Sequence, residues 1–475
     1  MADLTIRGAR RAQTSIAPDA LGELRATLRG EIVTPDSPAY DATRSIWNAM
    51  IDRRPGLIVR CGGSDDVVAA VRFARTHDLL VSVRGAGHNI AGHAVSDGGV
   101  MIDLSPMRSV TVDPTARTAI VAPGATLGDV DAATAPHGLA LPMGINSTTG
   151  IAGLTLGGGF GWLTRKHGLT VDNLLSAEVV TADGDRLTAS ASRNADLFWG
   201  IRGGGGNFGV VTSFTFRLHR VGPDLLCGLI VHPFAQAPAL LGEYRRLAAA
   251  APDELTAWVV LRKAPPLPFL PPEVHGKEVM VIAAVYAGDV WEGEKALQPL
   301  RALGSPIADV IAPQPFAAFQ QAFDPLLGAG ARNYWKSHDY TALSDGVLDV
   351  TLEYAARLPN EQCEIFIAHL GGAAGRVPAD ATAYAHRDAE FVMNVHTRWT
   401  DPAEDRKCVG WAREFFDRAA PFATGGVYVN FMPDDEADRV PSAYGGNYQR
   451  LVQLKAKYDP ENFFRQNQNI RPAGR

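Results

Sequence analysis

Arg84-Gly-Ala-Gly-His-Asn-Ile-Ala-Gly92 is the stretch that decides the fold. It follows an apolar, β-branched run and sets one histidine, His88, among small residues whose bare backbone N–H groups can surround a diphosphate. Taken alone, it is better explained as a tight turn with a surface histidine. A second glycine-rich segment, Gly144 to Gly161, reverses that preference. Two such loops with β structure between them suit a long cofactor threaded between subdomains better than a bare phosphate.

Better-known nucleotide motifs do not account for these glycines. The chain holds no GxxxxGKS or GxxxxGKT, so a phosphate loop of that kind is excluded. Gly204 to Gly209 does fit GxGxxG, but a dinucleotide fingerprint needs a strand before it and a helix after it. Here the pattern predicts a helix over 194–202 and a β-branched strand over 209–218. The dinucleotide alternative is therefore disfavoured.

Composition and charge fit an ordinary globular chain. Of 475 residues, 46% are hydrophobic and 20% are charged, which disfavours disorder and coiled coil. The net charge of −6, without a run of Lys or Arg, argues against a nucleic-acid partner. No apolar stretch reaches the roughly 18 residues of a membrane span, and Arg10-Arg11 lacks the apolar segment of an export signal. We expect no membrane partner and a cytoplasmic location.

The cysteines have neither the pairing nor the spacing of a metal or disulfide site. We therefore expect no metal, and four buried thiols at Cys61, Cys227, Cys363 and Cys408.

Hydrophobic periodicity and turn residues predict a first region dense in short strands. A strand, helix and strand are expected over 55–84, with Ser64 as the helix N-cap. Helices are also expected over 18–30 and from Thr126, and strands over 100–104, 109–113, 118–122, 177–181 and 186–189, the last two joined by an Asp-Gly turn. Beyond residue 222, strands and amphipathic helices alternate and glycines become fewer, which indicates a second domain.

The chain resembles the berberine bridge enzyme-like branch of the vanillyl-alcohol oxidase (PCMH-type) FAD-dependent oxidoreductases over nearly its whole length. The resemblance rests on RGxGHxxxG from Arg84, GxxxTxGxxGxxxGGGxG from Gly144, RKxGLxxDN from Arg165, DLFWxxRGGGGNFGxV from Asp196, YVNF from Tyr428 and YxxNYxRLxxxKxxYDPxNxFRxNQNI from Tyr444. It implies an α+β fold with a two-part PCMH-type FAD-binding domain over 1–220, its core at about 50–220. An antiparallel-sheet substrate domain with helices on one face is expected over 221–425, and a C-terminal segment over 426–475 returns to the FAD domain.

The resemblance also implies how FAD is held. His88 would bond the 8α methyl carbon of the flavin, and the backbone of Gly85 to Asn89 would bind the pyrophosphate. Many relatives have a second link through a cysteine where this chain has Asn146, so we expect one covalent link and none through cysteine. The expected cofactor-binding residues are Arg84, Gly85, Ala86, Gly87, His88, Asn89, Gly92, Gly144, Asn146, Thr149, Gly150, Gly153, Gly157, Gly158, Gly209, Val210, Asn430 and Asn467.

The catalytic base cannot be carried over from relatives. Phe160 and Phe431 stand where plant members have tyrosines, and Asn394 stands where relatives have Glu or Gln. Tyr334 and Lys336 would share one face of a strand, and the lysine could lower the phenol pKa from about 10, so this pair is the first expectation. The further expected catalytic positions are Asn394, His396 and Tyr428, with His338, Tyr444 and His167 as other candidates.

The resemblance implies an oxidase that takes a hydride from a C–H bond next to O or N of a small molecule, such as a sugar, alcohol, alkaloid or polyketide-like compound. Dioxygen would be the acceptor and hydrogen peroxide the product. Thr149 would either leave room for oxygen at the flavin or only form hydrogen bonds within its glycine-rich loop. Two alternatives stay open: a dehydrogenase that uses another acceptor, and a flavin-bearing protein without turnover.

Overall fold

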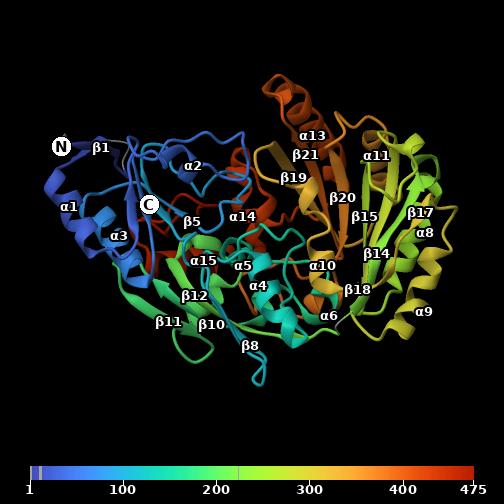
Figure 1. The fold of residues 1–475 in the computed structure, drawn as a ribbon, viewed down its shortest axis with the longest axis horizontal. Helices are drawn as coiled ribbons and strands as arrows, with labels where there is room; N and C mark the ends of the chain where they lie inside the picture. Colours follow the sequence, from blue (N-terminus) through green and yellow to red (C-terminus); the bar gives the residue numbers. More distant parts are fainter. Residues whose placement is uncertain (1–2, 10–12, 223, 475) are drawn as a thin grey trace.

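A four-stranded sheet holds the first glycine loop. The computed structural model describes residues 3–9, 13–222 and 224–474. Strands β3 (Glu31–Val33), β4 (Leu57–Arg60), β6 (Val100–Asp103) and β5 (Val81–Arg84) lie in that order, with β6 parallel to both neighbours. Helix α3 (Ser64–Thr76) connects β4 to β5 and packs on this sheet beside α1 (Pro18–Thr27) (Figure 1). β5 therefore delivers Arg84 and the loop after it to one end of the sheet.

The cap of α3 corrects the sequence prediction. Gly63, and not Ser64, occupies the N-cap position, and Ser64 is the first helical residue. The Gly63 carbonyl accepts from the N–H groups of Asp66 and Val67, and the buried carboxylate of Asp66 accepts from the backbone N–H groups of Arg29, Gly30 and Gly62. Small elements precede this unit: β1 (Leu4–Arg7), β2 (Gln13–Ile16) and α2 (Tyr40–Arg44).

A second, antiparallel sheet carries the other glycine segments. Its order is β11 (Arg186–Ser190), β10 (Leu174–Val180), β12 (Val210–Arg217), β8 (Thr118–Val121) and β7 (Val110–Asp113). The predicted β10–β11 hairpin is confirmed, and so is Thr126, which caps α4 (Leu127–Thr134). A helix, α7 (Ala195–Ile201), precedes the glycines at 203–206 and β12 follows them, as predicted. The other elements here are β9 (Leu139–Ala140), paired with β13 (His219–Arg220), α5 (Ile151–Leu156) and α6 (Thr164–His167).

The largest sheet is antiparallel throughout. Its order is β17 (Ala308–Asp309), β14 (Asp224–Pro233), β16 (Glu278–Tyr286), β15 (Leu255–Lys263), β20 (Glu364–His369), β21 (Phe391–Trp399) and β19 (Arg332–Tyr340), with β18 (Ala312–Pro315) also beside β14. Helices α8 (Ala237–Ala249), α9 (Val290–Arg301), α11 (Asp345–Ala355) and α13 (Asp405–Ala419) cover one face (Figure 1). Short helices α10 (Phe316–Gln320) and α12 (Gly372–Gly375) lie in its connections. The opposite face is left to line a cavity.

The C-terminal segment, with α14 (Val440–Tyr444) and α15 (Tyr448–Tyr458), packs on the second sheet. Lys455, fully buried, donates to the carbonyl of Asn207, and Asn467 donates to the carbonyl of Gly206. The α+β class is confirmed, while the domain boundaries at 220 and 425 stay predictions. Within the described ranges, no helix is both long and apolar enough to cross a membrane.

Candidate active site

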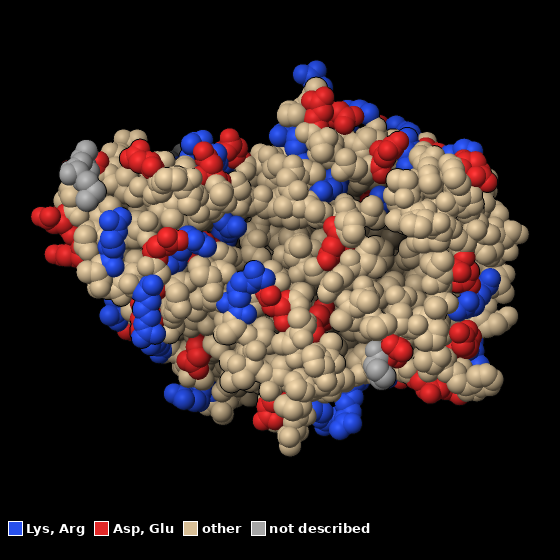
Figure 2. Space-filling view, viewed as in Figure 1, with Lys and Arg blue, Asp and Glu red and all other residues tan. Residues whose placement is uncertain are grey.

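A cavity of about 390 Å³ lies between the glycine loops and the uncovered face of the large sheet. The C-terminal segment closes it with residues from Tyr428 to Phe431 and from Gln466 to Gln468. Charged side chains on the face drawn in Figure 2 are interspersed in sign, with no single-sign patch. Among the described residues, no cluster of three or more potential metal ligands is found.

The two glycine loops meet at this cavity. A Cβ atom on Gly150 would lie 2.9 Å from both the backbone nitrogen and the Cβ of Ala86, so the loops pack backbone against backbone. Gly87 has a φ of +74°, a conformation that side chains disfavour. A Cβ on Gly153 would meet nothing within 4 Å, and Gly153 lines the cavity. The loops thus present bare backbone to the cavity.

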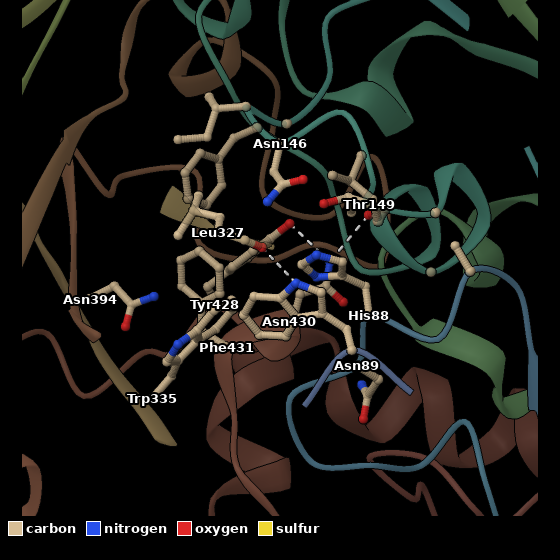
Figure 3. Close-up of a pocket in the computed structure, with 18 of the residues that line it drawn as sticks. His88, Asn89, Asn146, Thr149, Leu327, Trp335, Asn394, Tyr428, Asn430 and Phe431 are labelled. Atoms are coloured by element: carbon tan, nitrogen blue, oxygen red, sulfur yellow. Dashed lines mark hydrogen bonds between the residues drawn. The ribbon is translucent and has the colours of Figure 1, made fainter. Parts of the chain in front are cut away.

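His88 projects from the first loop into this space (Figure 3). Its ring stacks on Trp47, with ring centroids 4.3 Å apart and planes inclined by 23°. Burial lowers the pKa of His88 to about 3, so the imidazole is neutral near pH 7. Its Nε2 is buried and finds no hydrogen-bond partner in the described part of the chain. A neutral, oriented imidazole is the nucleophilic form of the side chain.

Most of the predicted cofactor-binding residues line the cavity. Those that do are Gly85, Ala86, Gly87, His88, Asn89, Gly144, Asn146, Thr149, Gly150, Gly153, Gly209, Val210, Asn430 and Asn467. The side chain of Asn146 is held by its own loop, because its oxygen accepts hydrogen bonds from the N–H and the hydroxyl of Thr148. All four cysteines are buried thiols, as predicted, and within the described ranges none lines the cavity.

Four predicted cofactor positions lie behind the cavity wall. Arg84 donates to the carbonyl of Thr43 beneath the loop, and Gly92 packs against Ile51. A Cβ on Gly157 would clash with the side chain of Asn430, and one on Gly158 would clash with the ring of Tyr384. Arg84, Gly92, Gly157 and Gly158 are therefore packed within the loops and are not among the residues that line the cavity.

Three charged or titratable side chains of the sheet face the cavity in one row. Arg262, Glu364 and His396 are cross-strand neighbours on β15, β20 and β21. An oxygen of Glu364 lies 2.8 Å from the Arg262 guanidinium, and its other oxygen lies 3.3 Å from Nδ1 of His396. Burial opposes ionisation of Glu364, but Arg262 and His396 hold its pKa below the ordinary value. Glu364 is thus an anion that orients the imidazole.

Asn394 and Tyr428 also line the cavity. Asn394 is fully buried, and neither side-chain polar atom has a partner in the described structure. The hydroxyl oxygen of Tyr428 accepts from the N–H of Gly159 at 3.0 Å and from the Asn430 amide at 2.9 Å. Burial nevertheless raises the pKa of Tyr428 to about 12. In Figure 3, Asn394 and Trp335 lie across the pocket from His88 and Thr149.

Tyr334 and Lys336 share a strand face with His338, as predicted, but that face is turned away from the cavity. The Tyr334 hydroxyl donates to Asp435, and Lys336 forms a 2.6 Å ion pair with Glu436. Burial raises the pKa of Tyr334 above its ordinary value. We therefore do not retain this pair as the base. Trp335, which lies between them, is the residue that β19 presents to the cavity.

The other candidates have separate positions. His338 stacks on Phe416 and His167 stacks on His219, outside the cavity. Tyr444 lines the cavity near Gly205. Sequence reasoning missed Arg262 and Glu364, whose only sequence signal is a charge alternating with apolar residues on a predicted strand.

Comparison with known proteins decides the family. The family model for an FAD binding domain matches residues 55–190, and the model for berberine and berberine-like proteins matches residues 427–471. FAD-linked oxidoreductase YgaK of Bacillus subtilis is 35% identical, over 94% of this chain and 98% of its own length. The chain belongs to the berberine bridge enzyme-like family of FAD-linked oxidoreductases. (R)-6-hydroxynicotine oxidase of Paenarthrobacter nicotinovorans is 32% identical, over 94% of this chain and 98% of its own.

Solved structures agree with this assignment. The crystal structure of 6-hydroxy-D-nicotine oxidase from Arthrobacter nicotinovorans matches with a TM-score of 0.83 and 29% identity, over 93% of this chain and 98% of that chain. The cavity of this berberine bridge enzyme-like protein also fits FAD on its own features. Its bare glycine backbone, the unpartnered Nε2 of His88 and a buried, unpartnered side-chain oxygen of Asn467 are groups that a bound cofactor would cover.

Proposed function

We propose that this FAD-linked oxidoreductase is an oxidase that holds FAD covalently through His88. In this proposal it oxidises a C–H bond next to O or N of a compact, largely apolar molecule and passes the electrons to dioxygen. The neutral, half-buried His88, with its buried and unpartnered Nε2 beside the two glycine loops, is the observation that carries it. A single link is expected because Asn146 replaces the cysteine of doubly linked relatives. The cytoplasmic location stays a sequence prediction.

When bound, FAD accepts the hydride. The protein supplies the rest: the loops hold the cofactor by backbone, and Trp47 holds the His88 ring in one plane. Preorganisation of this kind fixes the reacting atoms without any reordering during turnover.

His396 is the base that we favour. At pH 7 a phenol with a pKa of about 12 is ionised in only about one molecule in 10⁵, which disfavours Tyr428. An imidazole nitrogen is the commonest general base in enzymes. Glu364 orients the ring through Nδ1, and Nε2 lies 3.4 Å from the Asn333 side-chain oxygen, longer than a good hydrogen bond. An amide oxygen offers no hydrogen, so in the neutral ring, with Nδ1–H on Glu364, Nε2 carries the lone pair that takes a substrate proton.

The cavity wall favours a compact, largely apolar substrate. Apart from the Arg262, Glu364 and His396 row and Asn394, the sheet and its loops contribute Leu229, Val231, Trp258, Val260, Pro265, Leu267, Phe269, Leu270, Val279, Val281, Ala283 and Phe366. An oligosaccharide needs many polar partners when it leaves water, because each unpaired hydroxyl costs free energy. Similarity extends to a xylooligosaccharide oxidase at 28% identity and to the nicotine oxidase at 32%. We infer that an amine or alcohol on an apolar ring system fits this wall better than a sugar chain.

Acid precipitation tests the covalent link. We expect a yellow pellet from the wild type and a colourless one from His88→Ala. His93→Ala is the matched control, because His93 is also half-buried, lines the cavity and has a pKa lowered by desolvation to about 4. Flavin that stays in the supernatant, or that stays attached in His88→Ala, contradicts the proposal.

A substrate panel tests the oxidase activity. Anaerobic bleaching of the flavin by an amine or alcohol of the predicted class supports turnover, and rapid recovery in air supports dioxygen as acceptor. Bleaching without recovery in air identifies a dehydrogenase, and no bleaching by any compound favours a flavin protein without turnover.

A further inference from the structure

The side chain of Asn48 joins the first glycine loop to the large sheet. Asn48 lies between α2 and β4, and its exposed fraction is 2%. Its Nδ2 donates to the carbonyl of Ile90, two residues after His88, at 3.1 Å and to the carbonyl of Asn333 on β19 at 2.9 Å. Its Oδ1 accepts from the N–H of Asn333 at 3.0 Å and from the N–H of Met50 at 3.1 Å. Both donors and both lone pairs of this amide are therefore used on main-chain groups.

The bonds to Asn333 continue the large sheet beyond its last strand. β19 ends the strand order, with β21 on one side. The Asn48 amide exchanges two hydrogen bonds with the backbone of Asn333, as a residue of a neighbouring antiparallel strand would. The N–H of Ala49 adds a bond to the carbonyl of Ala331 at 3.0 Å. Segment 47–49 thus fixes the start of β19 from the side opposite β21.

The same segment holds His88. The N–H of Trp47 donates to the carbonyl of Gly87 at 3.0 Å, and its indole Nε1 donates to the carbonyl of Leu327 at 2.8 Å. The ring of Trp47 stacks on the ring of His88. The residue that orients His88 is therefore itself tied to the loop before β19.

Asn333 lies between this segment and His396, the base that we favour. Its side-chain oxygen is 3.4 Å from Nε2 of His396. A row of rings runs beside this contact, with centroids 5.4 Å apart from Trp47 to Trp335 and 4.8 Å apart from Trp335 to His396. Both ring pairs meet edge to face, a geometry that aromatic rings prefer. Two sets of contacts therefore join His88 to His396, and both pass through this segment.

We propose that Asn48 is a positioning residue that sets the separation between the flavin held by His88 and the base His396. The inference rests on the proposed function. Oxidation needs the C–H bond of the substrate aimed at the flavin while its O–H or N–H bond meets His396, and a small misplacement of either partner slows such a reaction. Asn48 contacts neither the substrate nor the base. It acts through Ile90 on one side and Asn333 on the other.

Asn447 supplies a matched control. Its exposed fraction is 7%, and its Nδ2 donates to the carbonyls of Ala379 and Thr382 at 2.7 and 3.1 Å. Like Asn48, it is a buried amide that ties its own segment to a distant one. In the described structure, however, its hydrogen bonds reach neither the first glycine loop nor β19.

Hydrogen exchange, resolved to short peptides by mass spectrometry, tests the link in the full-length protein. We expect Asn48→Ala to speed exchange by about tenfold or more in both 85–92 and 327–335, and to leave 379–383 unchanged. Asn447→Ala should speed exchange in 379–383 alone. A general loss of stability would instead speed exchange in all three segments in both variants. Exchange that rises in only one of 85–92 and 327–335, or in neither, overturns the link.

Anaerobic flavin reduction tests the positioning role, with the compound of the substrate panel that bleaches the wild type fastest and with rates taken per bound flavin. Asn48→Ala should slow reduction at saturating compound by about 10- to 10²-fold, with the half-saturating concentration nearly unchanged. Asn447→Ala should match the wild type. Reduction at the wild-type rate in Asn48→Ala shows that Asn48 only stabilises the fold, and overturns the proposal.

The wild type decides the link if Asn48→Ala does not fold. The N–H groups of Trp47, Ala49 and Asn333 should then open together and show equal protection from exchange, because one segment holds all three. Protection that differs by more than about tenfold among them overturns the link. If no compound of the panel bleaches the wild type, the proposed oxidase function fails, and the exchange pattern still decides whether Asn48 joins the two sides.

Discussion

The buried hydrogen bonds of Lys455 predict a large loss of stability when this residue is replaced by methionine. The Lys455 ammonium is fully buried and donates to Asn207 (2.8 Å), Asp459 (2.6 Å) and the carbonyl of Phe464 (2.9 Å). Lys455→Met removes three charge-assisted hydrogen bonds of about 1.5–3 kcal/mol each and leaves Asp459 as an unpaired buried anion. Two backbone N–H groups, of Phe463 and Phe464, still solvate Asp459. We therefore expect a net loss of about 3–5 kcal/mol in the free energy of unfolding.

A second lysine on the same helix supplies the control. Lys457 pairs with Asp196 at 2.5 Å, but their side chains are 59% and 41% exposed. Lys457→Met should therefore cost less than about 1 kcal/mol. Urea unfolding followed by tryptophan fluorescence measures both variants. If Lys455→Met costs no more than Lys457→Met, the buried ammonium does not anchor the C-terminal segment and our reasoning is wrong.

Three further predictions follow from the cavity. His396→Gln should slow flavin reduction by about 10²- to 10⁴-fold, and Tyr334→Phe should slow it by less than about threefold. Stopped-flow absorbance measures both rates of flavin reduction. A larger effect of Tyr334→Phe than of His396→Gln would restore Tyr334 as the base. Thr149→Leu should slow reoxidation in aerated buffer severalfold and more than it slows reduction, because the longer side chain fills space at the cavity; equal reoxidation rates argue against a role in oxygen access. The folded-state pKa of Asp339, about 6, lies above the ordinary value of 3.8. The protonated carboxyl group therefore contributes stability that is fully present below pH 3.8 and is lost as the pH rises through 6. The free energy of unfolding falls by about 3 kcal/mol over this range, at about 1.4 kcal/mol per pKa unit. Asp339→Asn should therefore stabilise the protein against urea above pH 6 and have little effect below pH 3.8, and a pH-independent effect would contradict the raised pKa.

Local patterns made the first region readable from the sequence. The glycine loops, the Asp-Gly hairpin and the helix start at Thr126 depend on neighbours within a few residues, and each is confirmed. The N-cap of α3 was misassigned by one residue, because the chain already turns into the helix at Gly63, whose carbonyl accepts from the N–H groups of Asp66 and Val67.

The cavity side of β19 could not be read in the same way. A period of two correctly grouped Tyr334, Lys336 and His338, but both faces of this strand are buried, so alternation does not reveal which face meets the cavity. Glu364 was missed for a related reason. Its role depends on Arg262 and His396, which only the register of three strands brings beside it.

The closing of the cavity by the C-terminal segment has a consequence for biosynthesis. His88 leaves the ribosome well before Tyr428, Asn430 and Asn467, which complete the cavity. Domains fold in order as the chain emerges, so the glycine loops of the nascent protein are exposed to water until the C-terminal segment packs against them. Attachment of the flavin to His88, as we propose it, is therefore expected only after the C-terminal segment has been made. A cell that makes this protein faster than it supplies FAD would accumulate finished chains that still await their cofactor.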